Sequence, residues 1–90
     1  MHTIFLDGDR YDSPRALHSA LKDMLALPDY YGHNADALCD CLRGRKEKLR
    51  VVVSGMGRGD VQRALRACLC VFEDAGAEVE RVFDPFLGQA

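Results

Sequence analysis

Short apolar strand patterns alternate with helical patterns along this 90-residue chain, and this alternation constrains the fold more than any other feature. The strand-like runs lie at residues 3–6, 49–53 and 79–83. Helical patterns separate them, and strands that alternate with helices favour parallel pairing through right-handed crossovers. We therefore expect a single α/β domain built on a parallel sheet, with the run at 49–53 as a buried strand.

The first helix has clear boundary signals. Ser13 followed by Pro14 is typical of an N-cap with proline in the first helical turn. One apolar stripe follows at helical spacing, and it consists of Leu17, Leu21, Met24 and Leu25. Because the residue before a proline disfavours helical backbone, we expect the helix to end at Leu27, before Pro28.

Two further helices are expected. The second covers about residues 34–42, with Gly44 as its stop signal. The third follows a glycine-rich connection at residues 55–59, takes Asp60 as its N-cap and stops at Gly76. Its apolar stripe consists of Val61, Leu65, Cys68, Leu69 and Phe72. We place the domain at residues 1–84 and a loose tail at residues 85–90.

The composition is that of an ordinary globular protein, with 48% apolar and 29% charged residues. No run approaches the roughly 18 apolar residues of a membrane-spanning helix. The first residues lack the basic-then-apolar pattern of a signal peptide. We therefore expect a cytoplasmic protein, not attached to a membrane, whose four cysteines are free thiols.

Charge is unevenly distributed, although the net charge is only −2. Residues 1–42 carry seven acids and three bases, and residues 67–90 carry five acids and one base. Residues 43–66, in contrast, carry eight bases and two acids. Acidic and basic surfaces are therefore expected side by side, and each would attract a different kind of partner.

The second helix has one polar and one apolar side when its residues are spaced at about 100° each. The outward side chains are those of Asp36, Cys39, Asp40 and Arg43, and Leu38 and Cys41 point inward. Asn34 can cap the helix, and Asp36 lies in its first turn, where the helix dipole favours a carboxylate. From the pattern alone this side is an ordinary solvated face or an acidic binding surface.

The segment from residue 25 to 44 resembles the barstar family of intracellular inhibitors of a secreted bacterial ribonuclease. The matching elements are Leu25-Ala26-Leu27-Pro28, Tyr30-Tyr31-Gly32, Asn34, Asp36-Ala37-Leu38, Asp40-Cys41-Leu42 and Gly44. The resemblance covers most of residues 1–84, is strongest in the middle third and weakens after Val53.

The resemblance implies a three-stranded parallel sheet packed with helices, and a binding protein without catalytic residues, metal or cofactor. It implies one small ribonuclease partner per molecule, whose active site the inhibitor fills with carboxylates in place of RNA phosphates. Asp40 matches the family's central acid. The implied contact positions are Tyr30, Gly32, Asn34, Asp36, Asp40 and Gly44, to which we add Tyr31, Cys39, Arg43 and Asp74.

Several positions depart from the family pattern. Cys39 and Arg45 stand where barstar carries tryptophans, and Arg43 replaces a small polar residue. A further family acid on the last helix aligns with Val71 or with Asp74, depending on where the shorter chain is aligned. The same shortening removes space for one of the family's short helices, near residues 55–59.

An alternative function rests on residues 43–50, which hold five bases in eight residues. Such a cluster could contact nucleic-acid phosphates, although no aromatic residues interleave with it and a solvated loop is the simpler interpretation.

A thiol-redox role for Cys39 and a metal site at His33 have weaker support. The cysteines form two Cys-x-Cys pairs, Cys39/Cys41 and Cys68/Cys70. On a helix the two side chains of such a pair point about 200° apart, so neither pair converges on a metal. His2 and His18 show no partners in the sequence.

Overall fold

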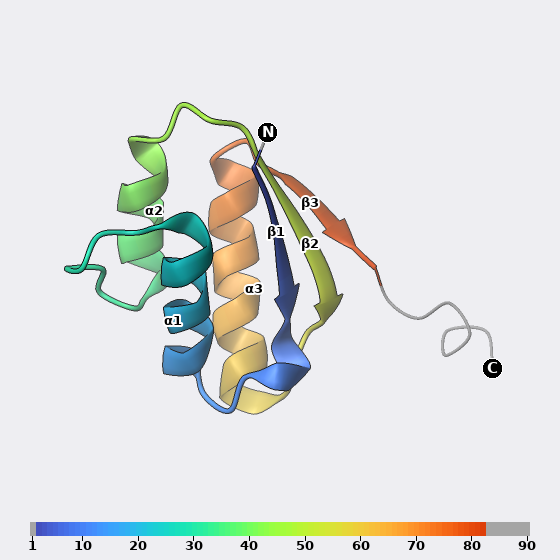
Figure 1. Cartoon of the computed structure of the whole chain (residues 1–90). Coiled ribbons are helices and arrows are strands. Elements are labelled where there is room, and N and C mark those ends of the chain that lie inside the picture. Colours follow the sequence, from blue (N-terminus) through green and yellow to red (C-terminus); the bar gives the residue numbers. More distant parts are fainter. Residues whose placement is uncertain (1, 83–90) are drawn as a thin grey trace.

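A computed structural model describes residues 2–82, and it has one parallel sheet with helices on one side (Figure 1). Its elements are β1 (His2–Asp7), a short 3-10 helix (Gly8–Arg10), α1 (Pro14–Leu25), α2 (Ala35–Arg43), β2 (Leu49–Gly55), α3 (Gly59–Asp74) and β3 (Glu78–Arg81). The expected α/β class and three-stranded parallel sheet are confirmed. Residues 83–90, which include the end of the expected last strand and the expected tail, lie outside the described residues.

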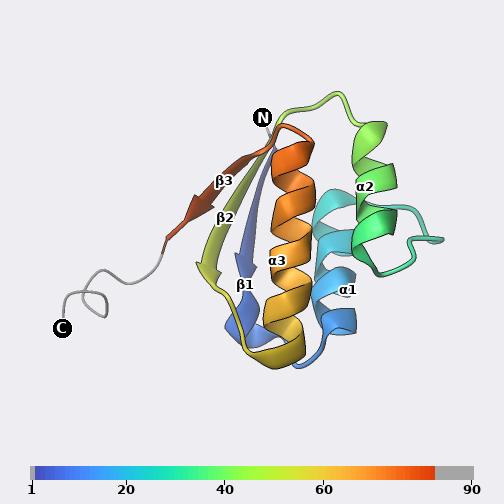
Figure 2. The same ribbon diagram turned by 180° about the vertical axis from the view of Figure 1, so that it is seen from behind.

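The strand order β1-β2-β3 explains why the helices share one face of the sheet. Both connections step in the same direction across the sheet, so right-handed crossovers place α1, α2 and α3 on the same side. Figure 2 shows this arrangement from behind, with β3 at one edge of the sheet. Of the three helices, α2 lies farthest from the strands, packed against α3 (Figure 1).

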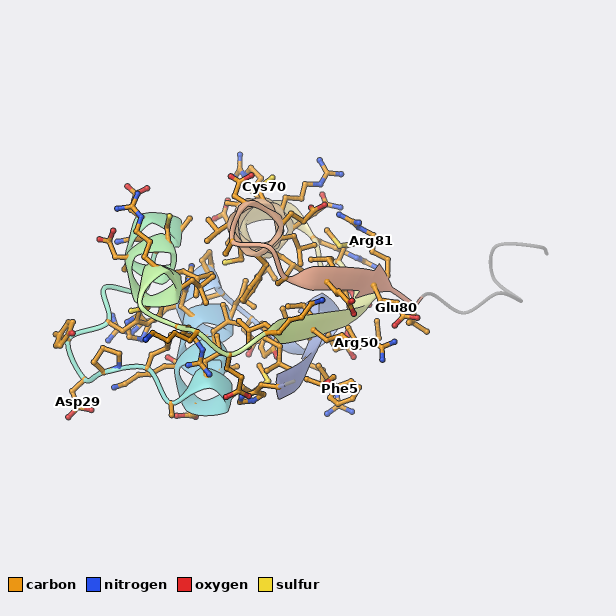
Figure 3. The ribbon with its side chains drawn as sticks, turned by 90° about the horizontal axis from the view of Figure 1, so that it is seen from above. Phe5, Asp29, Arg50, Cys70, Glu80 and Arg81 are labelled. Atoms are coloured by element: carbon orange, nitrogen blue, oxygen red, sulfur yellow. The ribbon has the colours of Figure 1, made fainter. Side chains whose placement is uncertain are left out.

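The run at residues 49–53, expected as a buried strand, is buried on one face of β2 only. Burial alternates along the strand, with Val51 and Val53 inside and Arg50 exposed. Arg50 forms an ion pair with Glu80 of β3. Figure 3 shows Phe5, Arg50 and Glu80 on the side of the sheet that faces away from the helices. The period-2 burial follows from the pleat of a strand with one solvated face.

The core lies between this sheet and the helices. From the sheet it takes Ile4, Leu6, Val51 and Val53, and from the helices Leu17, Leu21, Leu38, Leu42, Leu65, Leu69 and Phe72. Full burial of one such side chain contributes about 1.5–3 kcal/mol. The expected stripes on the first and third helices are confirmed, although Met24 is only partly buried.

The end of α1 differs from the expectation. The last helical residue is Leu25, not Leu27, because Ala26 adopts left-handed backbone with φ 51°. The amide of Leu27 then donates to the carbonyl of Lys22 at 2.9 Å, which closes the helix before Pro28 is reached. The start is confirmed, because the Ser13 hydroxyl accepts from the Ala16 amide at 3.2 Å.

The start of α3 also differs. Arg58 occupies the N-cap position without a side-chain cap, and Asp60 lies inside the first turn, paired with Arg63. Gly55 belongs to β2 and Gly59 to α3, so within the described residues no helix lies between these two elements. Gly76 follows the helix with φ +85°, as its predicted role as stop signal requires.

Candidate functional site

The outer side of α2 forms an acidic surface, here called the α2 face, which consists of Asp36, Cys39, Asp40 and Arg43. Asp36, Asp40 and Arg43 are exposed and Cys39 is half-buried, whereas Leu38 and Leu42 are buried against the core. The predicted orientation of the helix is therefore confirmed. Because the inner side chains of the helix are packed in the core, the orientation of the α2 face is fixed.

The start of α2 is capped as predicted. The Oδ1 atom of Asn34 accepts a hydrogen bond from the Ala37 amide at 2.8 Å, and its Nδ2 donates to the Gly32 carbonyl at 3.2 Å. Asp36 lies in the first turn, where its negative charge interacts favourably with the positive end of the helix dipole. Gly44 ends the helix with φ −86°, so no left-handed backbone requires a glycine there.

Tyr30 and Tyr31, in the turn before α2, point in opposite directions. Tyr30 is 86% exposed, whereas Tyr31 is 4% exposed and belongs to the core. In this structure the side chain of Tyr31 packs in the core beneath the turn, so it is not accessible to a partner. Asp29, beside the exposed tyrosine, lies at the outer tip of the loop (Figure 3).

A buried histidine fixes this turn, although sequence reasoning assigned it no partner. The Nδ1 atom of His18 lies 2.6 Å from the Tyr31 hydroxyl, and its Nε2 atom lies 3.9 Å from the Sγ of Cys68 in α3. His18 therefore links α1 to both the turn and α3. The burial of His18 did have a signal in the sequence, because this residue lies three positions before Leu21 and seven before Leu25, on the apolar stripe of the helix.

His33 supplies a second tie between the turn and α1. Its Nδ1 atom lies 2.9 Å from the Tyr31 carbonyl, and its Nε2 atom lies 3.3 Å from the Ser19 hydroxyl. His33 adopts φ 54°, which is left-handed backbone. This conformation is unfavourable in free energy for any residue that has a Cβ atom. Together the two histidines hold the backbone that leads into α2.

The groups around His18 are held neutral by their burial. Desolvation, followed by the nearby charge of His33, lowers the pKa of His18. Desolvation also raises the pKa of Cys68 to about 12 and raises the pKa of Tyr31. A neutral imidazole donates from one nitrogen and accepts at the other, so it can satisfy both neighbours.

A groove of about 490 Å³ runs between α2 and the carboxyl end of α3. It is lined by Cys39, Leu42, Arg43, Arg45, Val71, Asp74 and Ala75. Both candidates for the third acidic position therefore border the α2 face. Val71 is half-buried and apolar, so the carboxylate at this groove comes from the exposed Asp74.

Several basic side chains of residues 43–50 are bonded to other groups of the protein. Within residues 2–82, Arg43 pairs with Asp40 at 3.6 Å, Lys48 pairs with Glu78 at 3.6 Å, and Arg50 pairs with Glu80. The Nη1 of Arg45 donates to the carbonyl of Leu25 at 2.8 Å. These partners reduce the positive charge available to nucleic-acid phosphates.

Other kinds of site receive no support from the described part of the chain. There, no three His, Cys, Asp or Glu side chains gather closely enough to hold a metal ion. No helix between residues 2 and 82 has the length and apolar character needed to cross a membrane. The four cysteines are free thiols. His2 is also partnered, because its Nδ1 lies 3.8 Å from a carboxylate oxygen of Glu47.

Comparison with known proteins decides the family. The family model described as "Barstar (barnase inhibitor)" matches residues 1–88. The chain belongs to the barstar family. It is also similar to "Putative ribonuclease inhibitor YrdF" of Bacillus subtilis (strain 168), with 52% identity over 44 residues. That match covers 49% of this chain and 48% of the relative, so the chain matches about half the length of this relative.

Proposed function

We propose that this chain binds a small bacterial ribonuclease and blocks its active site with carboxylates that replace RNA phosphates. The observation that carries the proposal is the pair Asp36 and Asp40, exposed one turn apart on a helix whose other side is buried. Membership in the barstar family and the name of the Bacillus subtilis relative support a ribonuclease as the partner.

The chemistry of a ribonuclease explains why such a surface would bind it. An enzyme that cleaves a polyanion must place fixed positive groups where substrate phosphates bind. Carboxylates on a rigid helix can meet those groups with little loss of conformational entropy. Hydrogen bonds between guanidinium and carboxylate become strong once water is excluded. Tyr30, in the turn before α2, adds a large exposed ring with few rotatable bonds.

Asp40 is the expected centre of the interface, and Asp36 and Asp74 flank it. Asp40 lies on the middle of the α2 face, and its carboxylate is 75% exposed in the free protein. Its complete burial against cations would make its loss costly, because the partner's charges would then stay buried without a counter-charge. The fields of the two proteins would also accelerate their encounter.

Affinity capture tests the proposal. The wild-type protein, Asp40→Ala and Asp60→Ala are immobilised separately and exposed to extract and medium of the source cells. Asp60 is the matched control, because it is similarly exposed and pairs with an arginine three residues later, as Asp40 does. We expect a ribonuclease to be retained by wild type and Asp60→Ala but not by Asp40→Ala.

The captured enzyme is then assayed for RNA cleavage, with added inhibitor. One equivalent of wild-type protein should stop cleavage. Full ribonuclease activity with excess wild-type protein, or equal retention by Asp40→Ala, would contradict the proposal. Retention of RNA by the isolated protein at low salt, lost in a Lys46→Glu/Lys48→Glu variant, would instead support the nucleic-acid-binding alternative.

A further inference from the structure

The groove beside the α2 face combines apolar side chains with two guanidinium groups. Leu42, Val71 and Ala75 contribute the apolar lining, and Arg43 and Arg45 contribute guanidinium groups. Electrostatic interactions strengthen where apolar walls exclude water. An acidic protein surface thus contains a pocket that favours an anion.

Arg45 is held in place before any partner binds. Its Nη1 donates to the Leu25 carbonyl, which is otherwise an open acceptor at the end of α1. Within residues 2–82, its buried Nε–H has no hydrogen-bond acceptor. That buried atom is out of reach of a partner, so an acceptor would bind at another nitrogen of this guanidinium, which loses little conformational freedom because it is already ordered.

Arg43 stands at the junction of the groove and the α2 face. It is 76% exposed and lies 3.6 Å from the Asp40 carboxylate. A partner with only positive charge on its surface would meet repulsion at this point. With Asp74 on the same groove and Asp40 beside Arg43, two carboxylates match the two guanidinium groups. Within residues 2–82, however, Arg45 forms no ion pair of its own. A carboxylate of the partner would supply one.

We propose that the ribonuclease partner inserts an acidic side chain into this groove, where its carboxylate is bound by Arg43 and Arg45. This inference rests on the proposed function and deepens it, because it specifies a charge that the partner must carry. Guanidinium groups bind carboxylates through paired N–H donors, which a lysine cannot reproduce. Arg43 is then a specificity-determining residue, which selects against ribonucleases with a cation at the same place.

The test uses the captured ribonuclease, produced in pure form, and measures its dissociation constant for four variants. Arg43→Ala should weaken binding roughly tenfold, the cost of one charge-assisted hydrogen bond. Arg43→Glu should weaken it further. Arg63→Ala is the matched control, because Arg63 is equally exposed and also pairs with an aspartate three residues earlier. It should bind like wild type. Asp40→Ala reports on the proposed function independently.

A charge-exchange cycle identifies the acidic side chain. Each exposed Asp and Glu near the ribonuclease active site is changed to Lys, and one such change should restore binding to Arg43→Glu. If Arg43→Ala binds equally or more tightly while Asp40→Ala does not bind, the proposed function stands and this inference is wrong. The absence of any restoring substitution would also overturn it. If wild-type protein binds no ribonuclease, both proposals fall.

Discussion

The side chains of Tyr30 and Tyr31 are neighbours in the sequence but face opposite environments. Tyr30 is exposed in the turn before α2, and Tyr31 is buried with its hydroxyl 2.6 Å from the imidazole of His18. The turn therefore presents one aromatic ring and uses the other as an anchor. Because His33 also binds the backbone of Tyr31, the anchor holds both the side chain and the main chain.

Tyr31→Phe tests this anchor. The substitution keeps the ring but removes the hydroxyl, which leaves a buried nitrogen of His18 without a partner. We expect the free energy of unfolding in urea to fall by about 1–3 kcal/mol. Tyr30→Phe is the matched control and should leave stability unchanged, because its hydroxyl is exposed. Equal stability of the two variants would contradict the anchoring role.

The lowered pKa of His18 predicts a pH dependence of stability. Between its folded-state pKa and the ordinary value of 6.5, the unfolded chain binds more protons than the folded protein. Stability should therefore be fully present above pH 6.5 and should decrease as the pH falls through this window. Urea unfolding at a series of pH values measures the slope, and His18→Gln should flatten it. An unchanged slope in that variant would assign the effect to other groups.

Helix α2 is positioned by its cap at one end and by the core along one side. The hydrogen bonds of Asn34 fix the first turn, and Leu38 and Leu42 fix the rotation of the helix about its axis. These features were predicted from sequence, because cap residues and apolar periodicity are local signals. The left-handed Ala26 was not, because residues with a Cβ rarely adopt this backbone and alanine gives no sequence signal for it.

Asn34→Ala separates the structural role of the cap from its role in binding. Loss of the side-chain cap should reduce stability by about 1 kcal/mol. Ser13→Ala removes the equivalent cap of α1 and should cost a similar amount. Only Asn34→Ala should also weaken binding to the ribonuclease, because its turn leads into the α2 face. If both variants bind equally well, the order of this turn does not matter for binding.

Across the whole molecule, the topology brings Cys39 and Arg43 of the α2 face to the same groove as Asp74 of α3. The face of the sheet away from the helices carries the ion pair of Arg50 and Glu80. The order of the strands in the sheet was not predicted, whereas their parallel pairing followed from alternating sequence patterns. The partners of the basic segment did not, because Lys48 and Arg50 meet acids of β3 that lie 30 residues later in the chain. The cluster around His18 was missed for the same reason, since Cys68 is 50 residues away.

If the α2 face occupies the active site of the ribonuclease, inhibition must compete with RNA. RNA cleavage by the captured ribonuclease is measured at several RNA concentrations with wild type, Asp40→Asn and Asp60→Asn. We expect competition with RNA, and an inhibition constant raised on the order of a hundredfold or more for Asp40→Asn alone. Inhibition that does not depend on RNA concentration, or equal inhibition by Asp40→Asn and wild type, would contradict it.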